Sequence, residues 1–172
     1  MPQVNDYCKG CRAFYKAIIG LLARNNIVAI LFVGTPIYIL IALAASQIAI
    51  YSVYSSIVYT ILAILCIAWI LGTVCILRVY PNLLTISIFI YNCIAHWSLV
   101  SVIIMIFYGW KYVPSQMLGQ ILGTLFPLIL SLFVAGDVLV ECRRNLFTSI
   151  DNFRAQAIAE QSFSTGEAKE GV

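Results

Sequence analysis

The chain has 172 residues, of which 62% are hydrophobic and only 10% are charged, and its net charge is +3. A soluble globular domain carries about 25% charged residues, because its surface has to be hydrated. The composition therefore excludes a soluble enzyme, a nucleic-acid-binding domain and a disordered protein. It indicates an integral membrane protein.

Three stretches of the chain contain no Asp, Glu, Lys or Arg: residues 25–77, 79–110 and 112–136. A helix needs about 20 apolar residues to cross the hydrocarbon core, so the first stretch holds two spans and the others hold one each. We expect an all-α bundle of four transmembrane helices with short loops, occupying residues 27–140. The predicted spans are residues 27–46, 57–77, 83–108 and 117–140.

The basic residues are distributed unequally between the two sides of these spans. Only Lys111 lies between spans three and four, and the linker between spans one and two has none. Basic residues stay in the cytoplasm, so we expect both termini there. Cleavage of span one as a signal peptide near residues 42–44 is the alternative, but the long segment before the span favours a retained anchor. The other basic residues are Lys9, Arg12, Lys16, Arg24, Arg78, Arg143, Arg144, Arg154 and Lys169.

The N-terminal segment, residues 1–26, has the pattern of a basic amphipathic helix. Apolar side chains recur every three or four residues, and basic side chains occupy the other face. Such a helix lies along the membrane surface; the alternative is that it extends span one into water. The apolar set is Cys11, Phe14, Tyr15, Ile18, Leu21 and Leu22, and the basic set is Lys9, Arg12, Lys16 and Arg24.

The C-terminal segment, residues 141–172, divides into two predicted parts. Leu146, Ile150, Phe153 and Ala157 keep helical spacing, which predicts a second amphipathic helix over residues 144–160. From Gln161 onward the composition turns to Ser, Thr, Gly, Glu and Lys, which is typical of a short disordered tail.

Cysteines at the cytoplasmic ends of the predicted spans are candidates for acylation. Cys8, Cys11 and Cys142 lie beside basic and amphipathic segments, where reversible palmitoylation occurs. Cys8 and Cys11 form a single CxxC without a second ligand pair, so we expect no metal site. We also expect no cofactor.

Span three carries the polar residues Thr85, Asn92 and His96 on one helical face. One hypothesis is that they form a relay for protons or a ligand near the membrane midplane. The hypothesis we favour is that they tie span three to neighbouring helices by hydrogen bonds.

Two other features of the spans predict contacts inside or around the bundle. Asp137, near the end of span four, is expected to form an ion pair with Arg78 at the inner interface. Small residues at four-residue spacing predict close helix packing, either within the bundle or with a partner. They are Gly119, Gly123, Ser131 and Ala135 in span four, and Ala68 and Gly72 in span two.

No set of residues in the chain has the spacing of a known catalytic motif, so we expect no catalytic residues and no enzyme. The outline is similar to that of small tetraspan families such as the MARVEL-type vesicle proteins, a similarity of topology alone. The favoured hypothesis is a non-enzymatic tetraspan protein that organises membrane or serves as an accessory or scaffold subunit. A small oligomeric channel or transporter is the alternative, and a lipid-modifying enzyme comes third. Expected partners are the bilayer and other membrane proteins through span four, without nucleic acid, and a homo-oligomer is left open.

Overall fold

The computed structural model describes residues 4–45, 52–78, 80–109, 111 and 115–170, with side chains for residues 10–43, 56–78, 80–107, 111 and 118–161. Four of the described helices are long and apolar enough to cross a membrane, over Asn26–Leu43, Ser56–Arg78, Pro81–Phe107 and Leu118–Gln161. This confirms the predicted all-helical membrane architecture. The elements in chain order are α1 (Val4–Arg24), α2 (Asn26–Ala45), α3 (Ser52–Arg78), α4 (Pro81–Ile104), the π-helical turn η1 (Met105–Gly109) and α6 (Ser115–Glu170).

Local sequence explains where the helices begin. Asn25 separates α1 from α2, and its side-chain oxygen accepts a hydrogen bond of 2.9 Å from the backbone N–H of Ile27. That bond satisfies one of the free donors at the start of α2, as an N-cap does. Pro81 is the first residue of α4. Its missing N–H costs no hydrogen bond there, because the first N–H groups of a helix have no partner within the helix.

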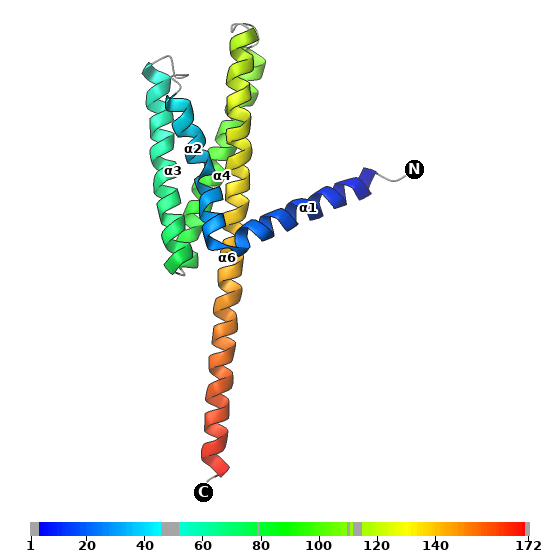
Figure 1. Cartoon of the computed structure of the whole chain (residues 1–172), viewed down its shortest axis with the longest axis vertical. Helices are drawn as coiled ribbons and strands as arrows, with labels where there is room; N and C mark the ends of the chain where they lie inside the picture. Colours follow the sequence, from blue (N-terminus) through cyan, green and yellow to red (C-terminus); the bar gives the residue numbers. More distant parts are fainter. Residues whose placement is uncertain (1–3, 46–51, 79, 110, 112–114, 171–172) are drawn as a thin grey trace.

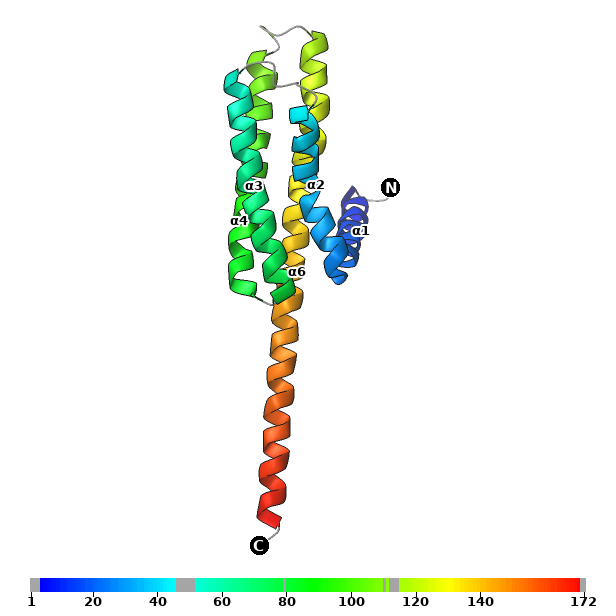
Figure 2. The same cartoon turned by 60° about the vertical axis from the view of Figure 1, so that its left-hand side comes forward.

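Helices α2, α3, α4 and the first half of α6 pack side by side as a bundle, while α1 leaves the bundle sideways (Figure 1). The second half of α6 continues beyond the bundle (Figure 2). The corner between α1 and α2 therefore lies at the end of the bundle from which α6 continues, and we call this end the terminal face. The arrangement separates a membrane-spanning part from two projecting helices.

Among the described residues, three side-chain hydrogen bonds join the helices of the bundle. Trp69 on α3 donates to the backbone oxygen of Ile30 on α2 at 3.0 Å. From α4, Ser87 donates to the oxygen of Ala68 at 2.9 Å and Tyr91 to that of Val33 at 2.7 Å. Val33 lies three residues before Pro36, in the turn where a proline ring disturbs the helix ladder. The Tyr91 hydroxyl thus bonds a carbonyl in this disturbed turn, where lipid could not do so.

A glycine lies where α3, α4 and α6 meet. A Cβ added at Gly72 on α3 would stand 3.5 Å from Leu139 Cδ2 and 3.6 Å from Ser87 Oγ. Ala68, one turn earlier, is fully buried and supplies the carbonyl that Ser87 bonds. Small residues at this spacing let helix backbones approach each other closely in membranes. Ala68 and Gly72 therefore lie at a helix–helix contact within the bundle.

The fourth span continues much further than predicted. Rather than ending near residue 140, α6 is one unbroken helix from Ser115 to Glu170. Residues 161–170, for which composition predicts a disordered tail, continue this helix as far as Glu170. Residues 171 and 172 lie outside the described residues. Only part of α6 can lie within a bilayer, since a span takes about 20 residues.

Candidate functional site

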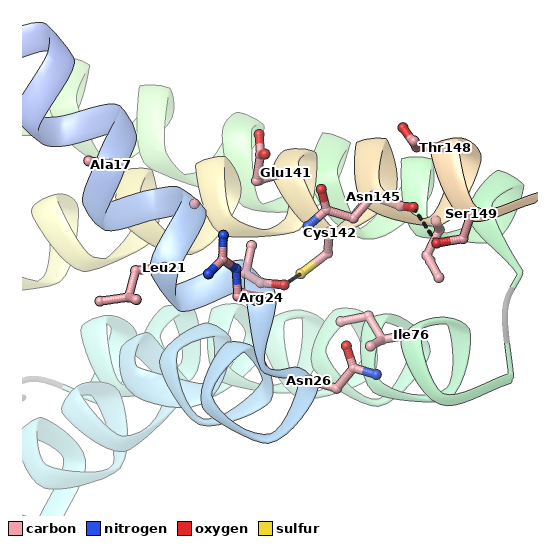
Figure 3. A pocket seen from close by; sticks show the side chains of 13 residues that line it. Ala17, Leu21, Arg24, Asn26, Ile76, Glu141, Cys142, Asn145, Thr148 and Ser149 are labelled. Carbon is pink, nitrogen blue, oxygen red and sulfur yellow. Dashed lines mark hydrogen bonds between the residues drawn. The ribbon is translucent and has the colours of Figure 1, made fainter. Parts of the chain in front are cut away.

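A pocket of about 840 Å³ opens at the terminal face, where α1 leaves the bundle and α6 continues beyond it. It lies between α1 and α6, with the start of α2 and the end of α3 on its other side (Figure 3). Its lining is half polar and half apolar in character. The residues that line it are Ala17, Gly20, Leu21, Ala23, Arg24, Asn26, Ile76, Glu141, Cys142, Asn145, Leu146, Thr148 and Ser149.

Three polar side chains reach the pocket from three different helices: Arg24 from α1, Asn26 from α2 and Asn145 from α6 (Figure 3). None of the three side chains makes a hydrogen bond or ion pair with another described side chain. The hydroxyls of Thr148 and Ser149 differ, because they donate to backbone oxygens one turn earlier on α6, at 3.0 and 2.9 Å. The free donors of the pocket are therefore one guanidinium and two amides.

The one carboxylate that lines the pocket is already paired. Glu141 accepts a hydrogen bond of 2.6 Å from Arg144, one turn further along α6. Its negative charge is thus balanced within α6, which leaves the positive charge of Arg24 uncompensated by any described side chain.

The candidate acylation sites lie in different surroundings. Cys142 is buried under the end of α1, with its sulfur 4.0 Å from the backbone oxygen of Ala23. Cys142 also lines the pocket, and its acylation stays a prediction. Cys11 is exposed on α1, and the side chain of Cys8 lies outside the described residues.

Asp137 does not pair with Arg78, and the predicted ion pair is wrong. Its carboxylate instead accepts a hydrogen bond of 2.6 Å from the hydroxyl of Tyr15 on α1. Desolvation of the phenol, followed by this hydrogen bond and the nearby negative charge, raises the pKa of Tyr15 to about 12. Tyr15 therefore keeps its proton at physiological pH and acts as a donor that joins α1 to α6.

The polar residues of α4 are satisfied mainly within their own helix. The Asn92 amide donates to the oxygen of Ile88 at 3.0 Å, and Nδ1 of His96 lies 2.7 Å from the oxygen of Asn92. Both side chains contact α6: Asn92 Oδ1 would lie 3.5 Å from a Cβ at Gly136, and His96 meets the Phe133 ring edge to face. Thr85 lies apart, on the exposed surface of α4. The structure thus brings Asn92 and His96 together against α6 without an interhelical hydrogen bond from either among the described residues.

The small residues of α6 divide between the core and the surface. Ala135 is fully buried, and Ser131 is half-buried and donates to the oxygen of Leu128 at 2.8 Å. Gly119 and Gly123 are exposed, and a Cβ at either position would meet no atom within 4 Å. The GxxxG part of the ridge therefore faces away from the bundle.

Sequence analysis missed the residues that make the terminal face distinctive. It grouped Arg24 with the other basic residues of α1, whereas in the structure Arg24 lines the same pocket as Asn26 and Asn145. The sequence gives little indication that these residues line one pocket, because α6 is far from α1 and α2 along the chain. Among the described residues, no group of three or more His, Cys, Asp or Glu could hold a metal ion. Comparisons of the chain with protein-family models, with curated proteins and with solved structures find no match.

Proposed function

We propose that this protein is a non-enzymatic, membrane-anchored scaffold or accessory subunit. Its bundle would serve as the anchor, and the distal half of α6 would bind another protein chain. In this proposal the terminal face is cytoplasmic, which the excess of basic residues on that side supports.

The observation that carries the proposal is the continuity of one face of α6. Within the bundle this face is buried, at Leu132, Ala135, Leu139 and Cys142. The same three- and four-residue spacing continues beyond the bundle as Leu146, Ile150, Phe153 and Ala157, which we call the α6 stripe. Leu146 still packs against the core, but beyond it no other described segment covers the stripe, and Phe153 is 71% exposed. An apolar helical face that leaves the membrane uncovered is typical of a surface that binds another helix.

The reach of α6 suits this role. From Glu141 to Glu170 the helix extends roughly 40 Å, at about 1.5 Å per residue. This length exceeds what anchoring requires, because the span is already complete within the bundle.

Helix α1 supports the same proposal. Phe14 and Leu21 are 70% and 68% exposed on a helix that runs sideways from the bundle (Figure 1). A helix that lies along the membrane surface buries such side chains in the acyl region, while Arg12 and Lys16 contact anionic headgroups. The hydrogen bond between Tyr15 and Asp137 would then hold α6 at a fixed orientation to the membrane surface.

Site-specific photo-crosslinking in native membranes tests the proposal. A photoreactive amino acid replaces Phe153 on the α6 stripe, and in a matched control it replaces Ala155, on the opposite face of the same turn. We expect a discrete adduct with a second chain from position 153 and little from position 155. Equal yields at the two positions, or no adduct from position 153, would contradict a binding role for the stripe.

A further inference from the structure

We infer that the pocket at the terminal face binds the phosphate of an anionic phospholipid, with Arg24 as its cationic partner and the amides of Asn26 and Asn145 as additional donors. This inference concerns a ligand of the bundle and does not depend on the proposed scaffold role.

The charges of the pocket select an anion. Arg24 is the one charged side chain of the lining that no described residue pairs, since Glu141 is bound to Arg144 at 2.6 Å. A guanidinium is suited to the oxygens of a phosphate, and the amides of Asn26 and Asn145 are further donors in the lining. A choline group would find no free carboxylate here, so a headgroup with net negative charge fits better than a zwitterionic one.

The depth of the pocket selects a lipid. Arg24 directly precedes the uncharged stretch of residues 25–77, and Ile76 lies at the end of that stretch on the opposite wall. The pocket therefore lies at the boundary between hydrocarbon and water, where phospholipid headgroups reside. Leu21 and Ile76 offer apolar surface to the glycerol and the first methylenes of the chains.

The pocket is also large enough and unobstructed. Its volume of about 840 Å³ lies within the range of small-ligand sites, about 300–1,000 Å³. Gly20 lines it, and a Cβ at that position would meet no atom within 4 Å. A larger side chain at Gly20 would therefore enter the pocket without displacing the protein around it.

Native mass spectrometry of the full-length protein in a neutral detergent tests the inference. The dissociation constant of the first bound lipid is measured for phosphatidylglycerol and for phosphatidylcholine with the same acyl chains. We expect phosphatidylglycerol to bind at least about tenfold more tightly, because the choline ammonium of phosphatidylcholine brings a positive charge near Arg24 without a free carboxylate to pair it. Equal affinities for the two lipids would overturn the inference.

Two matched pairs of variants test whether lipid binding requires the charge of Arg24 and the open space at Gly20. Arg24→Gln should weaken phosphatidylglycerol binding about ten- to hundredfold, whereas Arg154→Gln, which removes a charge from an exposed position of α6 outside the pocket, should change it less than about twofold. Gly20→Leu should block binding of both lipids, whereas Gly10→Leu, at an exposed position of α1, should not. Because Gly20→Leu fills open space, its loss of binding is measurable in a folded protein even if Arg24→Gln does not fold. If Arg24→Gln and Gly20→Leu behave like their controls, the pocket is not the lipid site.

A water-soluble phosphate ester would present the same phosphate group as a phospholipid. A competition experiment distinguishes the two ligands. We expect glycerol 3-phosphate at the concentration of the lipid to leave phosphatidylglycerol bound, because it lacks the acyl chains that contact Leu21 and Ile76. Displacement at equal concentration would overturn the assignment to a lipid.

Discussion

The hydroxyl of Tyr15 on α1 donates a hydrogen bond of 2.6 Å to the carboxylate of Asp137 on α6, across 122 positions of sequence. The bond joins the helix that leaves the bundle sideways to the helix that continues beyond it. The orientation of α1 relative to the bundle depends on this bond and on the burial of Ile19 and Ala23 near the corner.

Tyr15→Phe should loosen α1 from α6 without unfolding the bundle. Tyr15 is 40% exposed, so the loss of its hydrogen bond should destabilise docking by only about 1 kcal/mol. Limited trypsin cleavage after Arg12 and Lys16 should then be about fivefold faster, because cleavage follows the population of opened helix. Tyr38→Phe, which removes a hydroxyl from exposed Tyr38 on α2, should leave the rate unchanged. If both variants are cleaved at the wild-type rate, the bond does not hold α1.

The docking of α1 should be insensitive to pH across the physiological range. Docking raises the pKa of Tyr15 from 10.0 to about 12, so the docked state retains a proton that the undocked state loses in this interval. The stabilisation is therefore complete below pH 10, falls between pH 10 and 12, and is lost above pH 12. Trypsin cleavage of α1, normalised to a peptide substrate at each pH, should rise only above pH 10, and the Tyr15→Phe variant should lack this rise. A rise near pH 7 that persists in Tyr15→Phe would assign the pH response to another group.

The parts of this fold that the sequence predicted are those whose signals extend over many residues. Hydropathy over some 20 residues located the spans, because burial in lipid acts on every residue of a helix. The end of α6 was missed because composition after Gln161 does not reveal that a helix already formed in the membrane can extend its hydrogen-bond ladder outward. Extending an existing helix requires no new nucleation, so residues of low helix propensity can join its end.

The candidate site was harder to predict than the fold. Asp137 was assigned Arg78 because both lie near the same interface, but side-chain partners depend on the direction in which α1 leaves the bundle. That direction is set by the corner at Asn25, which no periodicity encodes. The convergence of Arg24, Asn26 and Asn145 depends on the same corner.

Tyr91→Phe should destabilise the bundle more than a comparable change at the surface. Tyr91 is fully buried, and its hydroxyl bonds the Val33 oxygen at 2.7 Å. Its removal deletes this buried bond between α4 and α2, which should cost about 1 kcal/mol. The thermal midpoint in detergent should fall measurably, while Tyr59→Phe at an exposed position should leave it unchanged. Equal midpoints for the two variants would show that the Tyr91 bond does not contribute.

Asn92 and His96 should prove structural. Their hydrogen bonds go to backbone oxygens of α4 itself. The Asn92 side chain lies against Gly136 of α6, and the His96 ring lies against Phe133. We expect His96→Leu to lower the thermal midpoint slightly by removing the edge-to-face contact, worth about 0.5–1.5 kcal/mol. Liposomes that contain the wild-type protein should show no proton flux above empty liposomes. Wild-type flux that disappears in His96→Leu would instead support a conduit along α4.

The proposed scaffold role rests on the α6 stripe, and the mass of the assembly in its native lipid tests it most directly. The protein is extracted in polymer-bounded native nanodiscs, and the particle mass is measured for the wild type, for Ile150→Glu combined with Phe153→Glu, and for Ala155→Glu. We expect the wild type and Ala155→Glu to share one mass, that of an assembly with at least a second protein chain. The doubly substituted protein should fall to the mass of a single chain, because two buried carboxylates would disfavour helix pairing. One mass for all three proteins would contradict the account.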